Sequence, residues 1–245
     1  DWLNWMMLGI IQGLTQGFAI LMAQRFGAKD EEQLRQTVGL STVLSVLSAL
    51  VLMLVGQLAV GPVLNILNTP AEIQRDAALY LRIMFMGIPV VMAYNLLACI
   101  LRSLGDGKTP LNAMIVASVI NIVLDIVFVL FFHWGIAGAA IATVLSRYVE
   151  LAIVMFWTHT HKEKNKFIVG AYRSLHIDKD IVYRIVRKGW PLLLNEVLWS
   201  IGMTTITQCY STRGLSAVAA VNITSTLSNL FRIVVMASGN SIAIL

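Results

Sequence analysis

The chain has 245 residues, of which 58% are hydrophobic and only 13% charged, whereas a soluble domain carries about 25% charged residues. This composition excludes an ordinary soluble protein, and the apolar runs are much longer than barrel strands, so the sequence predicts an all-α polytopic membrane protein. The net charge of +5 requires no nucleic-acid partner, because the basic residues of a membrane protein gather in its cytoplasmic loops.

Five membrane-spanning helices are expected in the first part of the chain. They cover residues 2–24, 37–58, 77–101, 110–132 and 135–158, and each is close to the roughly 20 residues that cross a bilayer. Glycines at every fourth position of the first span, Gly9, Gly13 and Gly17, allow a neighbouring helix to approach closely. Pro89 predicts a kink in the third span, and the polar segment 61–76 is typical of a loop with a short helix.

The fourth and fifth spans form one apolar stretch that we expect to fold back on itself as an antiparallel hairpin. The residues His-Trp-Gly at 133–135 interrupt this stretch, because Trp134 suits a membrane interface and Gly135 suits a helix end. Pro110 suits the first position of the fourth span, where the amide hydrogen that proline lacks would have no helical partner.

After Trp157 the sequence becomes polar and basic, and residues 159–188 are expected to form a linker. From Asp178, as an N-cap, apolar and basic side chains fall on different faces, which predicts an amphipathic helix on the membrane surface. Two further spans are expected over residues 189–211 and 215–245, and the second is cut short.

Three parts are therefore expected: N-terminal transmembrane helices at 1–158, a basic linker at 159–188, and the start of a second group of helices at 189–245. The chain lacks an initiator methionine and stops inside an apolar run, as expected of a fragment. Most basic residues fall in the loops at 25–36, 102–109 and 159–188, which are expected to be cytoplasmic. The turn at 133–135 then faces outward.

Polar side chains inside the hairpin indicate a binding site. Asn121 and Asp125 are four residues apart, so they share one face of a helix. Asp125 and Thr143 are equally far in sequence from Trp134, which gives them the same depth in an antiparallel hairpin. A carboxylate in the hydrocarbon region is costly unless it is paired, protonated or bound to an ion, and oxygen ligands suit a small hard cation. The sequence therefore predicts a site for Na⁺ or H⁺ at Asn121, Asp125 and Thr143.

Other charged side chains leave alternatives open. Asp125 can instead pair with Arg147, about one turn deeper on the next helix, or cap a neighbouring stretch of backbone. Arg147 also lies three residues before Glu150, and we expect these two side chains to pair with each other. Glu196 is a candidate for binding substrate or a proton, with a buried hydrogen bond to a neighbouring helix as the alternative. The sequence contains no evident nucleophile–base pair, metal-ligand cluster or phosphate loop, so an enzyme is not expected.

Several stretches together resemble the multidrug and toxic compound extrusion (MATE) family of antiporters. They agree with it in order and spacing over essentially the whole chain. The stretches are AQRFGA at 23–28, RSLGDGKTP at 102–110, Asn121-x3-Asp125, GIAGAAIAT at 135–143 and AVAAVN at 217–222.

The resemblance implies twelve helices in two six-helix lobes related by pseudo-twofold symmetry. This chain would hold about helices 2 to 8: five helices of the N-lobe and the first two of the C-lobe. The absent first helix normally supplies an acidic residue to the N-lobe pocket. The resemblance also implies that Asn121 and Asp125 on the fifth helix, with Thr143 on the sixth, bind the coupling cation. Many family members carry an acidic residue on the helix that holds Glu196.

We therefore expect a secondary active antiporter that exports organic cations or amphiphilic drugs in exchange for Na⁺ or H⁺. It would act as a monomer in the plasma membrane, with no cofactor besides the coupling ion. The alternative within the superfamily is a lipid-linked oligosaccharide flippase, which tends to line its cavity with basic residues. An intramembrane enzyme would need a second catalytic group level with Asp125, and a structural membrane subunit would not need Asp125 at all.

Overall fold

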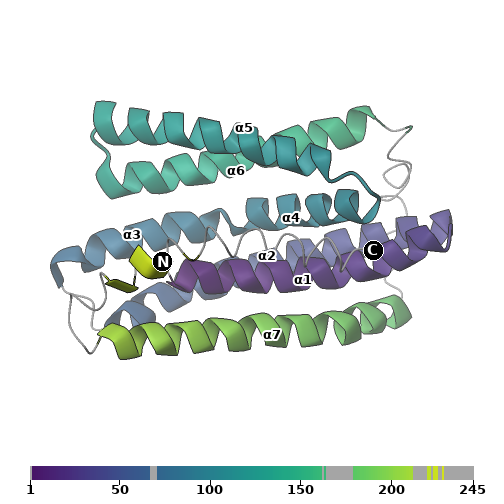
Figure 1. The fold of residues 1–245 in the computed structure, drawn as a ribbon, viewed down its shortest axis with the longest axis horizontal. Helices are drawn as coiled ribbons and strands as arrows, with labels where there is room; N and C mark the ends of the chain where they lie inside the picture. Colours follow the sequence, from purple (N-terminus) through teal and green to yellow (C-terminus); the bar gives the residue numbers. More distant parts are fainter. Residues whose placement is uncertain are drawn as a thin grey trace.

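Long apolar stretches become long helices in the computed structural model, which describes residues 2–66, 71–161, 163, 179–211, 220–221, 223–225 and 228. No strand occurs among these residues, and the expected all-α class is confirmed. The helices are α1 (Trp2–Gly27), α2 (Glu31–Ile66), α3 (Ala71–Met86), α4 (Ile88–Ser103), α5 (Lys108–Asp125), the π-helix η1 (Ile126–Phe131), α6 (Gly135–Thr160) and α7 (Lys179–Ser211) (Figure 1).

Membrane-length helices make up most of the described chain. Four of its helices are long and apolar enough to cross a membrane: Met6–Gly27, Glu31–Asn65, Lys108–Phe131 and Gly135–Thr160. Together, α3 and α4 make a fifth span if the bent pair is counted as one. Of the two further spans that we expected, the first lies within α7, which is not among the helices that are both long and apolar enough to cross a membrane. The second falls largely outside the described residues.

The third expected span is bent at a break between two helices. Gly87 separates α3 from α4, whose axes differ by 42°. Pro89 follows in the first turn of α4, and proline removes an amide donor and disfavours helical geometry in the residue before it. The kink expected at Pro89 is thus confirmed. A new helix, α4, begins at the bend.

The segment 61–76, expected to be mostly loop, is largely helical. Pro62 lies inside α2, which continues to Ile66, and α3 begins at Ala71. The expectation was wrong because proline does not have to end a helix in a membrane protein, where neighbouring groups satisfy the freed carbonyl. Helix α2 also begins early, because the Asp30 carboxylate accepts a hydrogen bond of 3.1 Å from the Gln33 amide and thereby caps the helix.

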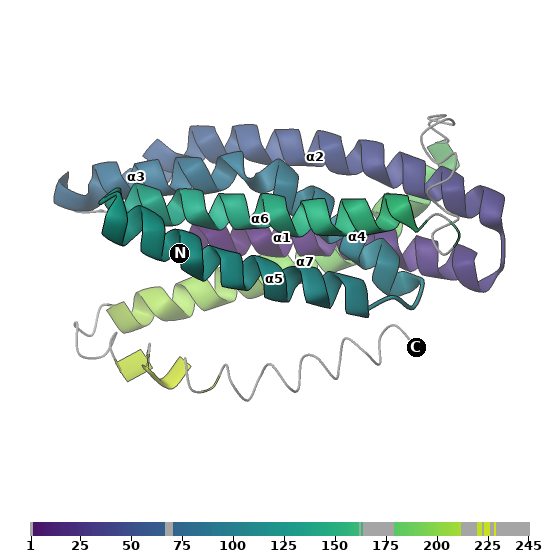
Figure 2. The same ribbon diagram turned by 90° about the horizontal axis from the view of Figure 1, so that it is seen from above.

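The expected hairpin is confirmed as α5 with η1 against α6, which lie antiparallel and in contact (Figures 1 and 2). Helix α5 begins at Lys108, so Pro110 is its third residue rather than its first, still within the turn whose amides have no helical partner. In the connecting turn His133 has φ 54°, and Gly135 has φ 55°. The Trp134 ring packs on Phe128 with ring centroids 5.1 Å apart.

Helix α7 replaces two elements that we expected to be separate. The amphipathic helix after Asp178 and the span from residue 189 form one helix that runs through Pro191. It packs along α1, on the opposite side of the bundle from the α5–α6 pair (Figure 1). At their crossing, a Cβ atom added to Gly17 would lie 2.7 Å from the Gly189 Cα. The close approach expected from the glycines of the first span is confirmed at Gly17.

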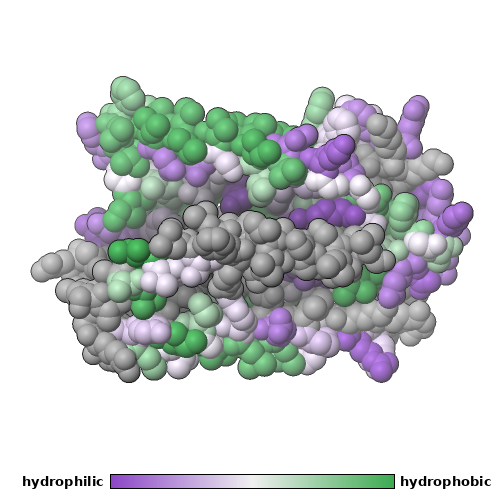
Figure 3. Space-filling model, in the orientation of Figure 1, coloured by the Kyte–Doolittle hydropathy of each residue, from purple (hydrophilic) through white to green (hydrophobic). Residues whose placement is uncertain are grey.

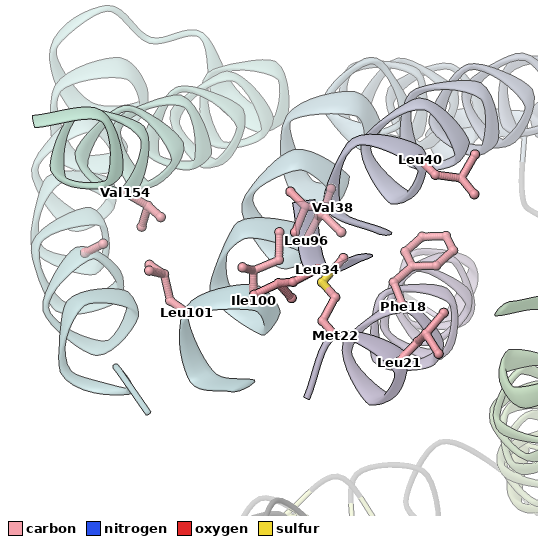
Figure 4. Close-up of a cluster of buried hydrophobic side chains, with 11 residues drawn as sticks. Phe18, Leu21, Met22, Leu34, Val38, Leu40, Leu96, Ile100, Leu101 and Val154 are labelled. Atoms are coloured by element: carbon pink, nitrogen blue, oxygen red, sulfur yellow. The ribbon is translucent and has the colours of Figure 1, made fainter. Parts of the chain in front are cut away.

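The buried core lies among α1, α2 and α4. One cluster joins Phe18 and Met22 of α1 to residues of α2 and α4 (Figure 4). In the same view Leu101 and Val154 face each other between α4 and α6. Helix α5 contributes Ala113 to this cluster and otherwise presents a continuous hydrophobic face (Figure 3). The α5–α6 hairpin therefore carries its polar residues at the edge of the core.

Candidate cation site and neighbouring cavity

The candidate site starts with two polar side chains one turn apart on α5. Asn121 and Asp125 are both partly buried. The Asn121 Nδ2 and Asp125 Oδ1 atoms are buried and have no hydrogen-bond partner. Buried polar atoms are nearly always paired, so the unpaired Asp125 oxygen marks a place where a cation or a proton is expected. The Asn121 Nδ2 group is a hydrogen-bond donor, and the amide would contribute its oxygen to a cation. The structure brings these two residues together as the sequence predicted.

The backbone changes at the same place. Asp125 is the last residue of α5, and the π-helix η1 begins at Ile126. A π-turn widens a helix and interrupts its regular bonding, and such turns occur often at functional sites. Nothing in the amino-acid pattern distinguishes this segment from an ordinary apolar helix, so the sequence did not indicate it.

Thr143 lies on α6, the helix that packs against α5. Its hydroxyl donates a hydrogen bond of 3.0 Å to the Ala139 carbonyl, which leaves the hydroxyl oxygen free to accept a bond or contact a cation. In the part of the chain that the structure describes, no hydrogen bond joins Thr143 to Asn121 or Asp125. The three residues therefore occupy facing helices without direct hydrogen bonding.

Arg147 pairs with Glu150, as the sequence predicted. The Arg147 Nη1 atom donates to Glu150 Oε2 at 2.7 Å. The Glu150 side chain is fully buried, whereas that of Arg147 is 42% exposed. Because Arg147 is engaged with Glu150, the alternative pairing of Arg147 with Asp125 is not formed. The three-residue spacing indicated the partner, but it gave no sign that the carboxylate would be completely buried.

A cavity of about 150 Å³ lies where α3 breaks from α4. Its polar lining residues are Tyr80, Thr143 and Arg147, and its apolar walls include Met7, Ile11 and Met84. Neither Asn121 nor Asp125 lines it. Thr143 thus lines this cavity from α6, the helix that packs against α5. Sequence reasoning missed the cavity, for which the only local signal was the Gly87–Pro89 break.

The remaining predictions concern residues of α7 and metal-binding clusters. Glu196 lies within α7, but its side chain is not among those described, so its role stays a prediction. Among the described residues, no group of three or more His, Cys, Asp or Glu side chains is placed to hold a metal ion. The candidate site thus combines a single carboxylate with neutral oxygen groups.

This fold and site define a multi-pass helical protein of the plasma membrane with a polar site inside a transmembrane hairpin. The family model described as MatE matches residues 2–127, and the chain belongs to this family. The expected MATE-like architecture is confirmed by solved structures. The inward-facing conformation of a multidrug resistance MATE family transporter matches with TM-score 0.81 and 25% identity, over 94% of this chain and 52% of that one.

Two further comparisons extend the match. A MOP superfamily transporter from Pyrococcus furiosus, described by the reverse polarity of its binding pocket, matches with TM-score 0.82 and 26% identity, over 92% of this chain and 50% of that one. The probable multidrug resistance protein YoeA of Bacillus subtilis (strain 168) is 29% identical over 246 residues, which cover 99% of this chain and 53% of YoeA. The chain spans about half the length of the curated relatives that it matches.

Proposed function

We propose that the whole protein is a secondary active antiporter that exports organic cations or amphiphilic drugs in exchange for Na⁺ or H⁺. Membership of the MatE family supports transport rather than catalysis. Similar proteins carry names such as probable multidrug resistance protein and multidrug export protein. The substrates and the coupling ion of this protein are part of the proposal.

The observation that carries the proposal is the unpaired carboxylate oxygen of Asp125 inside a transmembrane helix. An ionised carboxylate in the hydrocarbon region is unfavourable by several kcal/mol unless a proton, a cation or a basic side chain compensates it. Arg147 does not compensate it, because Arg147 binds Glu150. A transported proton or Na⁺ ion would satisfy Asp125, with Asn121 and Thr143 as neutral oxygen ligands.

Thr143 offers a physical route from the cation to the substrate. Its side chain lines the cavity beside α6, and α6 packs against the helix that carries Asp125. A substrate that draws on the Thr143 hydroxyl removes a ligand from the cation, so that binding of the two is competitive. Exchange requires such competition, because a carrier that binds both ligands equally well at once does not couple them.

The test is drug export by the full-length protein carrying Asp125→Asn. This change keeps the size of the side chain and removes its charge, so we expect ion-driven ethidium export to be lost while expression and membrane insertion remain normal. Ser118→Ala, on the exposed part of the same helix, is the matched control and should export normally. Undiminished export by Asp125→Asn would refute the proposal.

The alternative function, a lipid-linked oligosaccharide flippase, calls for a cavity with several basic residues. Arg147 is the one charged residue among those that line the described cavity, and its charge is compensated by Glu150. One guanidinium falls short of the several basic residues that a lipid pyrophosphate calls for. The cavity therefore favours a small amphiphile over a lipid pyrophosphate.

A further inference from the structure

We infer that the cavity between α1, α3, α4 and α6 is a subsite for a small aromatic acid, or for the acidic ring of a larger substrate, with Arg147 binding the anionic group. The inference rests on the proposed transport function and names a class of chemical group that the transporter accepts. Arg147 would thereby determine specificity in a site that is separate from the candidate cation ligands on α5.

The size of the cavity limits its occupant to a single ring. A volume of about 150 Å³ is close to that of an apolar protein cavity that binds benzene. Most of the wall is apolar, and Met7 and Met84 contribute flexible thioethers. Methionine sulfur makes favourable contacts with aromatic rings and adapts to their shape. A flat ring is therefore better suited to this space than a branched or strongly polar body.

The charge of the cavity selects an anionic group on that ring. Arg147 lines the cavity, whereas Glu150 does not and is fully buried. The cavity is therefore lined by the basic member of the ion pair and not by its acidic member. One guanidinium N–H is bound to Glu150 at 2.7 Å, and a guanidinium has five such donors in a planar fork. Further donors remain for a carboxylate, which this fork matches in shape.

The ion pair also prepares Arg147 for binding. A free arginine side chain loses rotational freedom when it binds a ligand, and this loss reduces affinity. Here the bond to Glu150 holds the guanidinium in place before any ligand arrives. Tyr80 also lines the cavity, and a tyrosine hydroxyl can donate a second hydrogen bond to the same anionic group.

The experiment compares two probes of nearly equal shape, benzoate and benzamide, by calorimetric titration of the purified full-length protein. Wild type should bind benzoate at least about tenfold more tightly, as expected for charge-assisted hydrogen bonds. Arg147→Gln/Glu150→Gln removes both charges together, so that no buried carboxylate is left without its cation. This double variant should bind the two probes equally. Equal binding in wild type, or a preference that persists in the double variant, would overturn the inference.

A matched control removes an equivalent ion pair elsewhere. Glu31 and Arg35 pair at 3.3 Å on the exposed start of α2, and Glu31→Gln/Arg35→Gln should keep the preference for benzoate. Val91→Phe places a bulky ring in the cavity and should abolish binding of both probes. If the probes still bind to Val91→Phe, they bind outside this cavity, and the proposed subsite is refuted.

Failure of the subsite is distinguishable from failure of the proposed antiport. Benzoate binding is measured on purified protein and needs no ion gradient, whereas the antiport is tested by ion-driven ethidium export and depends on Asp125. If the protein exports ethidium but shows no preference for benzoate, only the subsite is refuted. If the preference for benzoate depends on Arg147 but the protein exports no ethidium, only the proposed antiport is refuted.

Discussion

Arg147 donates a hydrogen bond of 2.7 Å to Glu150 one turn further along α6, and the accepting carboxylate is completely buried. The pair gives each charge a fixed partner within the helix hairpin. It also leaves Asp125, on the neighbouring helix, without a basic partner among the described residues. The two carboxylates of the hairpin therefore differ in their basic partner: Glu150 has Arg147, and Asp125 has none among the described residues, although each keeps one unpaired buried oxygen.

The first prediction concerns the stability of this pair. Arg147→Gln leaves the Glu150 charge buried and uncompensated, so we expect the free energy of unfolding to fall by about 1–3 kcal/mol, less than for a fully buried pair because Arg147 is partly exposed. Adding Glu150→Gln should recover most of the loss. Thermal unfolding of the purified variants measures both effects, and a double variant as unstable as Arg147→Gln would show that the two charges are not coupled.

A second prediction tests the crossing of α1 and α7. A Cβ atom at Gly17 would lie 2.7 Å from the Gly189 Cα, whereas a Cβ atom at Gly189 would lie 3.6 Å from the Gly17 Cα, an ordinary contact. Gly17→Ala should therefore lower stability by about 1–3 kcal/mol, and Gly189→Ala should be tolerated. Gly202→Ala, where an added Cβ meets no atom within 4 Å, is the control. Equal melting temperatures for all three variants would contradict this helix crossing.

A third prediction concerns Asp106, which caps α5 outside the membrane. Its carboxylate accepts hydrogen bonds from the Thr109 amide at 3.0 Å and from the Thr109 hydroxyl at 2.7 Å. Burial alone would raise the pKa of Asp106, but the hydrogen bonds from Thr109 hold it below its ordinary value of 3.8. Asp106→Ala should lower the free energy of unfolding by about 1 kcal/mol at neutral pH.

The pH dependence of this effect has a definite sign. Because the pKa of Asp106 is lower in the folded protein, its charged form stabilises the fold above the ordinary pKa, and this contribution is lost as the pH falls below about 4. The difference in thermal midpoint between wild type and Asp106→Ala should therefore shrink between about pH 6 and about pH 3. A difference that stays constant would show that the charge of Asp106 does not contribute.

Sequence reasoning succeeded where the signal was local. The apolar stretch interrupted at Trp134 was enough to predict the hairpin, and the four-residue spacing was enough to bring Asn121 and Asp125 together. It failed where tertiary contacts decide. Pro62 and Pro89 look alike in sequence, yet one lies inside a continuous helix and the other follows a 42° break. Local patterns do not report which neighbouring groups satisfy a freed carbonyl.

The cavity shows the same limit at the level of the site. Arg147 and Thr143 were singled out from the sequence, but the cavity that they line also needs Met7 from α1 and Tyr80 from α3. These residues come together only through packing of four helices. Spacing along one helix predicts partners such as Arg147 and Glu150. It cannot predict that Arg147 lines a cavity whereas Glu150 is fully buried.

A fourth prediction tests the orientation of the hairpin. Basic residues place the loop before α5 in the cytoplasm, so a cysteine at His133 should react with a membrane-impermeant maleimide added to intact cells, and a cysteine at Lys108 should not. Cys209 is exposed and should first be replaced by serine. Lys108 is the first residue of α5, and His133 lies in the connection that follows η1. Labelling at Lys108 but not at His133 would show that the hairpin has the opposite orientation.

The last prediction identifies the coupling ion through stability. A ligand that binds only the folded protein raises its stability in proportion to the logarithm of ligand concentration above the dissociation constant. If Na⁺ binds Asp125, the thermal midpoint of full-length wild type should rise with NaCl but not with an equal concentration of choline chloride. Asp125→Asn should lose this response, whereas Asn121→Ala and Thr143→Ala, which each remove one neutral ligand, should need more Na⁺ for the same shift.

If a proton is bound instead, the thermal midpoint should depend on pH more strongly in wild type than in Asp125→Asn, and it should not change with Na⁺. Ser118→Ala, at the exposed face of α5, should behave as wild type in both series. A wild type and an Asp125→Asn variant with the same response to Na⁺ and to pH would leave Asp125 without a role in ion binding.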